Sequence, residues 1–401
     1  MADNNENKVL NVPHLRFPEF SGEWNKYTIN DLATVVGGGT PDTTVKSYWG
    51  GDIQWFTPSE IGKNKYVDFS KRTITRDGLD NSSAKLLPLH TILLSSRATV
   101  GECSIASNEC TTNQGFQSLI AKQCNIDFLY YLIQTKKKDL IRNACGSTFL
   151  EISANEIRKI KVAVPVQNEQ EQIAKLLSLI DERIATQNKI IEDLKKLKSA
   201  ISKYLFARKD LLETTICLSN IATLKNGYAF QSGKYNAQGK WKILTITNVP
   251  GERYINDEDC NCIINLPNDI QDHQVLKEGD ILISLTGNVG RVSLCKNGNY
   301  LLNQRVGLLQ LAKNVNQEFL YQILSSQRFE NSMIACGQGA AQMNIGKGDV
   351  ENYVLPYSSN GNNILFAAKI LHSYDECIIN ELRRLTLLTM QKQYLLTQMF
   401  I

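Results

Sequence analysis

The stretch Leu93-Leu94-Ser95-Ser96-Arg97-Ala98-Thr99-Val100-Gly101-Glu102-Cys103-Ser104 returns in the second half of the chain as Leu282-Ile283-Ser284-Leu285-Thr286-Gly287-Asn288-Val289-Gly290-Arg291-Val292-Ser293. Later features follow both copies in the same order: Asn-Gln at 113–114 and 303–304, Phe-Leu-Tyr at 128–130 and 319–321, Ala-Cys-Gly at 144–146 and 335–337, and proline at 165 and 356. The sequence therefore predicts two similar globular modules. Such a repeat suits a partner that offers two similar sites at a fixed separation.

The composition is that of a globular protein with more than one domain. Its 401 residues exceed what a single hydrophobic core usually supports. Apolar residues make up 42% and charged residues 21%, and the formal net charge is only +4. So small a positive charge does not by itself indicate nucleic acid. A DNA-binding chain of this composition would concentrate its cations on one face or share the task with a partner.

The sequence predicts a cytoplasmic protein without metal. Residues 1–6 are polar and form no signal segment, and no apolar run approaches membrane-spanning length. We therefore expect the ten cysteines to be free thiols in a reducing compartment. Cys260 and Cys262 lack the spacing of a zinc site, and the four histidines form no HExxH pattern.

The modules are expected to be mixed α/β. A lead-in at 1–23 precedes the first module at 24–165, and the second module spans 209–358. Short apolar runs at 52–56 and 91–95 are typical of strands, and residues 126–138 predict a helix with an apolar side. The order of the strands is left open.

Each module is followed by a long helical pattern, at 166–208 and 359–401. Apolar residues recur in alternating steps of four and three, which is typical of a helix that packs along another helix. The first seam comprises Ile173, Leu177, Ile180, Ile184, Gln187, Ile191, Leu194, Lys198, Ile201 and Leu205, and the second comprises Ala367, Leu371, Tyr374, Ile378, Glu381, Leu385, Leu388, Lys392, Leu395 and Met399. The first helix would extend roughly 58 Å at about 1.5 Å per residue.

Polar residues interrupt both seams at the same steps, as Gln187 with Glu381 and Lys198 with Lys392. These matching interruptions favour an intramolecular helix pair, a coiled coil, over two helices that each cover only their own module. If a pseudo-two-fold axis relates the modules, the helices must run antiparallel.

Motifs of catalysis are absent from the sequence. The glycine-rich stretches 37–41 and 346–348 lack the Gly-Lys-Ser/Thr of a P-loop, so the first is predicted to be a turn. No Pro-Pro dipeptide occurs, which argues against the Asn/Asp-Pro-Pro-Tyr/Phe loop of a DNA amino-methyltransferase. No Gly-x-Ser-x-Gly elbow is present either.

With these catalytic motifs missing, we look for side chains that could bind DNA. Side-chain amides pair with adenine and arginine pairs with guanine, whereas lysine and arginine also bind phosphates. The candidate DNA-binding residues are Arg97, Thr99, Asn113, Gln114, Lys136, Lys137, Thr286, Asn288, Arg291, Asn303, Gln304 and Arg305. Two alternatives stay open: the amides cap the backbone of turns, and the lysines form a solvated face. The differing tips of the repeated turns suit two readers of different sequences, although surface drift gives the same pattern.

Several short stretches, in this order, resemble one family. They are Val12-Pro13-His14-Leu15-Arg16-Phe17-Pro18-Glu19-Phe20, Gly39-Thr40-Pro41, Tyr48-Trp49-Gly50-Gly51-Asp52-Ile53, Thr57-Pro58-Ser59, Gly146-Ser147-Thr148, and Val164-Pro165 followed by Glu169-Gln170-Glu171-Gln172-Ile173. Together with the repeat, they make the chain resemble the DNA-specificity (S) subunit of Type I restriction-modification systems over essentially its whole length. One departure is that Pro356 is followed by Tyr357-Ser358-Ser359-Asn360-Gly361, without the Glu-Gln stretch.

The resemblance implies two target-recognition domains, each reading half of a split asymmetric sequence in double-stranded DNA, separated by antiparallel helices. It also implies two methyltransferase (M) subunits on the helices and restriction (R) subunits in the complex. S-adenosylmethionine would belong to the M subunit, and ATP with Mg to the R subunit, so this chain would bind no cofactor. Base-contacting residues cannot be transferred, because the recognition loops of the family vary with the target.

Three other functions remain as alternatives. The specificity subunit of a combined cleavage-methylation (Type II) system would look similar. An enzyme of unknown type is disfavoured by the missing motifs. A purely structural coiled-coil protein would leave the two elaborate modules unexplained.

Overall fold

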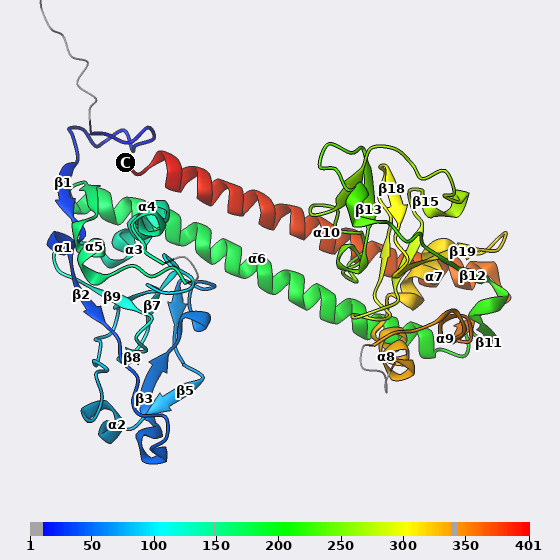
Figure 1. The fold of residues 1–401 in the computed structure, drawn as a ribbon, viewed down its shortest axis with the longest axis horizontal. Helices are drawn as coiled ribbons and strands as arrows, with labels where there is room; N and C mark the ends of the chain where they lie inside the picture. Colours follow the sequence, from blue (N-terminus) through cyan, green and yellow to red (C-terminus); the bar gives the residue numbers. More distant parts are fainter. Residues whose placement is uncertain (1–10, 147–148, 338–342) are drawn as a thin grey trace, which may run out of the picture. The chain divides into compact units, whose positions relative to one another are not determined.

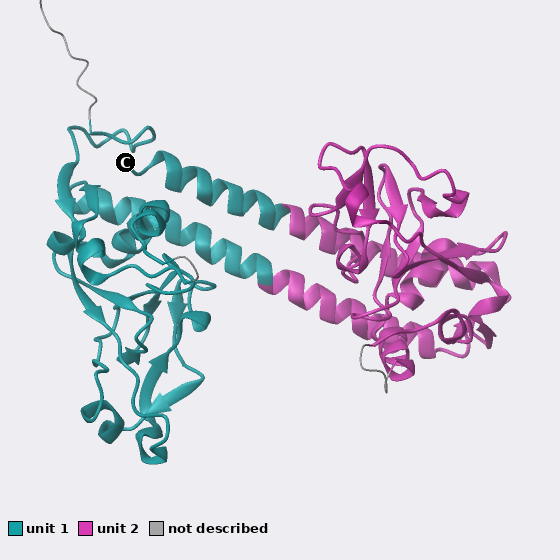
Figure 2. Ribbon diagram, in the orientation of Figure 1, with its two compact units in different colours: residues 1–188, 384–401 teal, residues 189–383 magenta. Residues whose placement is uncertain are grey.

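The computed structural model describes residues 11–146, 149–337 and 343–401 (Figure 1). These form two compact units, unit 1 (residues 1–188 and 384–401) and unit 2 (residues 189–383) (Figure 2). Each unit combines one α/β module with one stretch of helix α6 (Gln167–Ala207) and one stretch of helix α10 (Gly361–Gln398). Residues 1–10 of the predicted lead-in, and Ser147 and Thr148 of the family motif, lie outside the described residues.

The module of unit 1 contains three sheets. Its strands are β1 (Asn25–Thr28), β2 (Ala33–Gly37), β3 (Trp49–Phe56), β4 (Tyr66–Val67), β5 (Arg72–Ile74), β6 (Ile92–Leu94), β7 (Cys103–Ala106), β8 (Cys110–Thr112), β9 (Gln117–Ala121) and β10 (Lys161–Val164). The sheet orders are β2-β9-β6-β7-β4, β5-β3-β8 and β1-β10. The helices are α1 (Ile29–Leu32), α2 (Arg76–Asp80), α3 (Ile126–Thr135), α4 (Lys137–Arg142) and α5 (Ala154–Lys159).

The module of unit 2 has a corresponding strand order. Its strands are β11 (Thr214–Cys217), β12 (Ala222–Asn226), β13 (Trp241–Leu244), β14 (Asn261–Ile263), β15 (Val275–Leu276), β16 (Ile281–Ser284), β17 (Val292–Leu294), β18 (Tyr300–Leu302), β19 (Val306–Leu311) and β20 (Val354–Tyr357). The sheets are β12-β19-β16-β17, β14-β13-β18-β15 and β11-β20. Helices α7 (Gln317–Leu324), α8 (Gln327–Cys336) and α9 (Lys347–Glu351) complete it.

The duplication predicted from the sequence therefore extends to topology. The order β2-β9-β6-β7 is repeated as β12-β19-β16-β17. In the second sheet of each module, one pair of neighbouring strands is parallel, β3 with β8 and β13 with β18. The mixed α/β class is confirmed. The helix predicted over 126–138 is wrong in one respect, because the chain bends at Lys136 and forms α3 and α4 instead.

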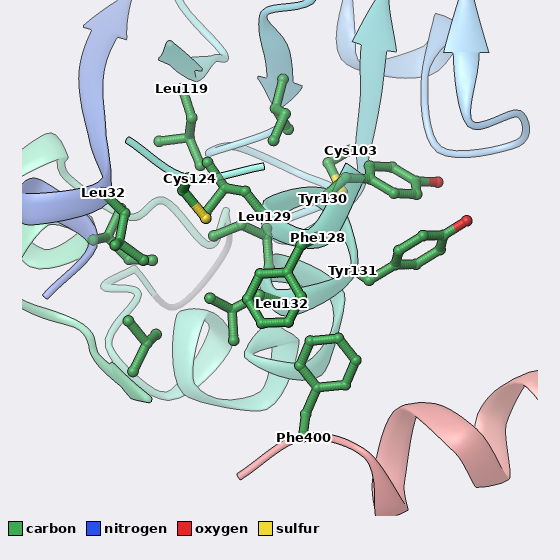
Figure 3. Packing of buried hydrophobic residues seen from close by; sticks show 14 of the residues in the cluster. Leu32, Cys103, Leu119, Cys124, Phe128, Leu129, Tyr130, Tyr131, Leu132 and Phe400 are labelled. Carbon is green, nitrogen blue, oxygen red and sulfur yellow. The ribbon is translucent and has the colours of Figure 1, made fainter. Parts of the chain in front are cut away.

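The core of unit 1 includes the end of the chain. Figure 3 shows the ring of Phe400, just beyond α10, against the ring of Phe128 on α3, with centroids 5.2 Å apart. Trp24 meets Phe400 edge-on at 6.3 Å, and Ile173 and Leu177 of α6 are buried in the same cluster. Burial of each such side chain contributes about 1.5–3 kcal/mol. The module is thus completed by residues distant from it in sequence.

Unit 2 makes the corresponding contact with the other helix. Phe206 of α6 meets Phe319 of α7 edge-on at 6.3 Å, and Leu205 belongs to the core of the unit. Ala367 and Leu371 of α10 are fully buried in this core. In each unit, one long helix leaves the module and the other ends against it.

The two long helices begin differently, as the sequence indicated. At α6, buried Glu169 accepts hydrogen bonds from Arg16 at 2.8 Å and from the Trp24 indole at 3.2 Å. Gln170 donates to the Pro165 carbonyl and accepts from the Asn125 amide at the start of α3. These bonds connect the lead-in and the module to α6.

At α10, the missing Glu-Gln pair is replaced by a carboxylate from upstream. The amide of Ser359 donates to Glu213 at 2.8 Å. Hydrogen bonds from the Glu213 backbone, Ser358 and Ser359 lower the pKa of Glu213 to about 2. The Ser358 hydroxyl accepts from the Asn360 amide just before the helix.

All ten cysteines are free. No helix within the described ranges is both long enough and apolar enough to cross a bilayer.

Candidate nucleic-acid interface

Four loops meet at one edge of the first module. The Gly39 amide donates to the Thr112 carbonyl at 2.8 Å, and the Asn113 amide donates to the Phe56 carbonyl at 3.0 Å. The Ser96 amide donates to the Gly115 carbonyl at 2.8 Å. These bonds hold together the segments 38–40, 57–60, 96–101 and 113–115, which we call loop cluster 1.

The second module builds the same arrangement from corresponding residues. The Tyr228 amide donates to the Leu302 carbonyl at 2.8 Å, the Asn303 amide to the Leu244 carbonyl at 3.2 Å, and the Leu285 amide to the Arg305 carbonyl at 3.0 Å. The segments 227–228, 245–248, 285–290 and 303–305 form loop cluster 2. Each of the three backbone bonds has its counterpart in loop cluster 1.

A glycine permits the close approach of two loops in each cluster. A Cβ atom added to Gly38 would overlap with the carbonyl oxygen of Asn113, and one added to Gly227 would overlap with that of Asn303. The predicted turn at 37–41 is not formed: Gly37 ends strand β2, and residues 38–41 continue as an irregular segment in which the missing side chain of Gly38 lets the loop at Asn113 pack closely.

The repeated Gly turn needs a left-handed backbone at its tip. Ala98 has φ +63° and the equivalent Gly287 has φ +71°, so the first module holds a non-glycine residue in a disfavoured region. Beside Ala98, Thr99 is exposed, whereas Arg97 is ion-paired with Glu151 at 2.6 Å. The Arg97 charge is therefore already neutralised within the unit.

The tip in the second module differs. Asn288 is exposed, and Arg291 lies 3.5 Å from Glu330. The Thr286 hydroxyl is buried and has no hydrogen-bond partner among the described residues. The two turns thus share a backbone but present different polar groups.

In both Asn-Gln pairs the asparagine closes a turn and the glutamine is exposed at the surface. The side-chain oxygen of Asn113 accepts from the Gly115 amide at 2.9 Å, and that of Asn303 accepts from the Arg305 amide at 3.2 Å. Both bonds are those expected of an asparagine that closes a turn. Gln114 is exposed and accepts a hydrogen bond from the hydroxyl of Thr40.

Loop cluster 2 leaves three candidate side chains available, of which Asn288 lies at the tip of the repeated turn. Gln304 and Arg305 are exposed, and neither side chain has a hydrogen-bond or ion-pair partner within the described part of the chain. An unpaired exposed guanidinium can contact a base edge or a phosphate without first breaking an internal ion pair. Among the cations of the twelve candidates, Arg305 alone has a side chain with no hydrogen-bond or ion-pair partner within residues 11–146, 149–337 and 343–401.

The two lysine candidates are engaged elsewhere. Lys136 donates to the backbone carbonyl of Ile401 at 2.8 Å, and burial lowers the pKa of Lys136. Lys136 is therefore not a free cation in this structure, and its phosphate contact stays a prediction. Lys137 pairs with Glu102, beside the repeated turn. No local sequence pattern could reveal a contact with the last residue.

Aromatic groups near the clusters were not among the candidates. The Trp55 indole donates to the Gly39 carbonyl at 2.9 Å, and the Arg72 guanidinium lies 3.6 Å from the ring centre of Trp49. Next to loop cluster 2, Tyr228 and Phe230 line a cavity of about 450 Å³. The aromatic content of these segments was visible in the sequence, but their convergence was not.

Comparison with known proteins identifies the family. The model of the Type I restriction modification DNA specificity domain matches residues 21–196 and again residues 213–389. The chain belongs to this family. The two matches correspond to the two modules with their helices, so the duplication is a duplication of this domain.

The curated relatives that the chain matches are also specificity subunits of Type I restriction enzymes. The chain is 38% identical over 192 residues to the Type I restriction enzyme MjaIX specificity subunit of Methanocaldococcus jannaschii, a stretch covering 46% of this chain and 44% of that protein. It is 28% identical over 206 residues to the EcoR124I/EcoR124II specificity subunit of Escherichia coli, covering 49% and 50%. The chain thus spans about half the length of the curated relatives it matches.

A solved structure shares the fold. The chain superimposes on the crystal structure of the Type I restriction-modification S subunit from M. genitalium with a TM-score of 0.58 and 19% sequence identity. The superposition covers 97% of this chain and 99% of the M. genitalium chain. At this level of identity the likeness concerns the arrangement of elements alone.

We expect Arg305→Ala to weaken binding of the assembled complex to its preferred duplex. Loss of a bidentate contact to guanine costs about 1–3 kcal/mol, or roughly 5- to 160-fold in affinity. Lys136→Ala is the matched control and should leave affinity unchanged, because Lys136 faces the chain end. Titration of labelled duplexes at fixed salt measures both. Equal losses for the two variants, or none for Arg305→Ala, would contradict the assignment.

Proposed function

We propose that this chain is the non-catalytic DNA sequence-specificity subunit of a Type I restriction-modification complex. Each module reads one half of a bipartite, asymmetric site through its loop cluster. The observation that carries the proposal is the pair of loop clusters, built by the same three backbone hydrogen bonds but ending in different polar tips. A common frame with different tips is what two readers of different half-sites require.

We assign methyl transfer and DNA cleavage to partner subunits. No group of three or more metal-ligating side chains occurs in the parts of the chain that the structure describes. S-adenosylmethionine would bind in the methyltransferase (M) subunits, and ATP with Mg in the restriction (R) subunits. The combined cleavage-methylation (Type II) system remains the second candidate, and the family description favours Type I over it.

We further propose that α6 and α10 form an antiparallel pair related by a pseudo-two-fold axis. In unit 1, Asp181 of α6 lies 2.7 Å from Lys392 of α10, and in unit 2, Lys198 of α6 lies 2.6 Å from Asp375 of α10. Residue numbers rise along α6 as they fall along α10, and the same number of residues separates the two contacts on both helices. This supports one continuous antiparallel register.

The helices would also dock the methyltransferase subunits. Apolar side chains remain exposed along both: Leu179, Ile190, Leu197 and Tyr204 on α6, and Leu365, Phe366, Leu382, Leu387, Met390 and Tyr394 on α10. Those on α6 are spaced by seven or eleven residues, so they share one face at 3.6 residues per turn. An exposed apolar stripe on a helix is suited to a partner helix.

We expect specificity to be modular. Exchange of residues 24–165 for the equivalent module of another specificity subunit should change one half of the methylated motif and preserve the other. The reason is that each loop cluster is built within its own module. Mapping of methylated motifs in cells that carry the exchanged subunit measures this, and the purified chain alone should transfer no methyl group. A folded, assembled exchange that alters both halves would contradict independent reading.

We expect Leu197→Glu combined with Tyr204→Glu to abolish docking. The carboxylates would be buried without partners in an apolar interface, which is strongly unfavourable. Co-purification with the coexpressed methyltransferase should fall at least tenfold. Phe69→Glu, which alters an 80% exposed residue on the first module, is the control and should leave co-purification intact. Undiminished recovery with the double variant would place the docking surface elsewhere.

We expect helix length to set the unread gap between the half-sites. Four residues inserted after Gln187 and after Glu381 add about 6 Å to each helix and nearly restore the seam, because 3.6 residues make one turn. At about 3.4 Å per base pair the preferred gap should lengthen by one or two base pairs. Motif mapping should return the same half-sites. An unchanged gap in an active complex would show that helix length is not the ruler.

A further inference from the structure

Two lysines interrupt the apolar seams at equivalent steps, and both are largely buried. Lys392 of α10 contacts Asp181 of α6, and Lys198 of α6 contacts Asp375 of α10. The lysine side chains are 15% and 18% exposed. A buried lysine in a helix seam costs desolvation that leucine would not. Helix packing alone therefore does not explain why lysine occupies these two seam positions.

In unit 1, this ion pair is part of a larger polar cluster. The Tyr131 hydroxyl of α3 donates to Asp181 at 2.6 Å. Burial, followed by the Asp181 carboxylate, raises the pKa of Tyr131, so the hydroxyl stays protonated and remains a donor. Lys65 pairs with Asp127 of α3 at 2.7 Å and donates to Ser178 of α6 at 2.6 Å.

In unit 2, the corresponding cluster is more continuous. Arg253 contacts Glu318 of α7 at 2.7 Å and Asp375 of α10 at 2.9 Å. Gln322 of α7 donates to Asp375 at 2.6 Å and to Glu318 at 2.7 Å. Burial alone would raise the pKa of Glu318, but hydrogen bonds from Arg253 and Gln322 keep it low, so Glu318 stays charged.

The two clusters use corresponding positions in the repeat. The pairs, unit 1 residue first, are Lys65 and Arg253, Asp127 and Glu318, Tyr131 and Gln322, Asp181 and Asp375, and Lys392 and Lys198. Residue types differ at three of the five pairs, and one contact differs: Arg253 reaches the α10 carboxylate of Asp375, whereas Lys65 reaches α6 through Ser178. Each cluster joins three segments: a module, α6 and α10.

The charges in each cluster balance. Two lysine or arginine cations face two carboxylates in each cluster, and in unit 2 the His372 ring also lies 3.6 Å from Glu318, so each carboxylate has its partners only when all segments are in place. A module displaced along the helices by one turn would leave buried charges without partners, whereas the surrounding aliphatic contacts would tolerate such a shift. Buried polar residues that select one register among several apolar alternatives are known from coiled coils.

We propose that these two clusters are clamps that fix the position of each module on the helix pair, and that Asp181, Asp375, Lys198 and Lys392 are the positioning residues of each half-site reader. The inference rests on the proposed function, in which the gap between the half-sites depends on where the modules are held. The clamps would make that gap a single value. Their loss would relax the gap without changing the bases that each module reads.

The test uses the full chain in complex with its methyltransferase, and compares Lys392→Met with Lys392→Arg. The methionine keeps the aliphatic length but leaves Asp181 without its cation, whereas arginine retains the charge. Methylation is measured on duplexes whose gap is the preferred one, or one base pair shorter or longer. We expect the preference for the native gap to fall at least tenfold in Lys392→Met, with both half-sites unchanged. Lys392→Arg should retain it.

Two further variants guard against simple unfolding. Tyr131→Phe removes one hydrogen bond from Asp181, and Tyr131→Gln introduces the residue that the other cluster uses there. A weaker preference for the native gap in Tyr131→Phe, together with a restored preference in Tyr131→Gln, would support the clamp. These two variants decide the matter if Lys392→Met fails to assemble. Lys196→Met, in an exposed ion pair with Asp193 on α6, is the negative control.

The outcomes separate the clamp from the function it rests on. A native gap preference in both Lys392→Met and Tyr131→Phe, with the gap still shifted by the helix insertions, would overturn the clamp and leave the proposed function standing. A complex that recognises no split sequence would overturn the proposed function. Amide hydrogen exchange would then judge the clamp alone: faster exchange around Asp181 in Lys392→Met, with unchanged strands, supports it, and unaltered exchange refutes it.

Discussion

Burial of both long helices in the core of each module is the constraint on which the structure depends. In unit 1, α6 contributes Ile173 and Leu177 to the core, and the chain end contributes Phe400. In unit 2, the roles are exchanged, with Leu205 from the end of α6 and Leu371 from the first half of α10. Neither core can close until a segment distant in sequence arrives. The hydrophobic effect therefore couples the path of each helix to the folding of both units.

That constraint explains why the compact units do not coincide with the halves of the duplicated sequence. The repeat divides the chain into two successive copies, but unit 1 includes residues 384–401 from the second copy. Each unit is a module of one copy completed by helix segments of both. In both units the Phe at the end of a long helix packs on the module helix of the other copy. Phe400 on Phe128 and Phe206 on Phe319 are the two contacts.

Polar groups have two distinct tasks in this architecture. In the loop clusters, backbone hydrogen bonds build a frame that is the same in both modules, and the exposed tips differ. In the seam, by contrast, buried Asp and Lys side chains meet at corresponding places with balanced charge. The exposed side chains of the loop clusters can vary because water solvates any polar group placed there. Buried charges cannot vary singly, because an unpaired one has no solvent to stabilise it.

Local patterns in the sequence were sufficient for the class of each element. The duplication, the α/β character of the modules and the two long helices follow from repeats and periodicities that a few neighbouring residues determine. The turn role of Asn113 was also open to local reasoning, whereas the packing of Gly38 against Asn113 was not. Only the tertiary structure decided that the chain bends at Lys136, that this lysine holds Ile401, and that Lys65, Tyr131, Asp181 and Lys392 meet in one cluster. The physical reason is that periodicity is encoded along the chain, whereas such contacts join residues whose separation in sequence carries no signal of their proximity in space.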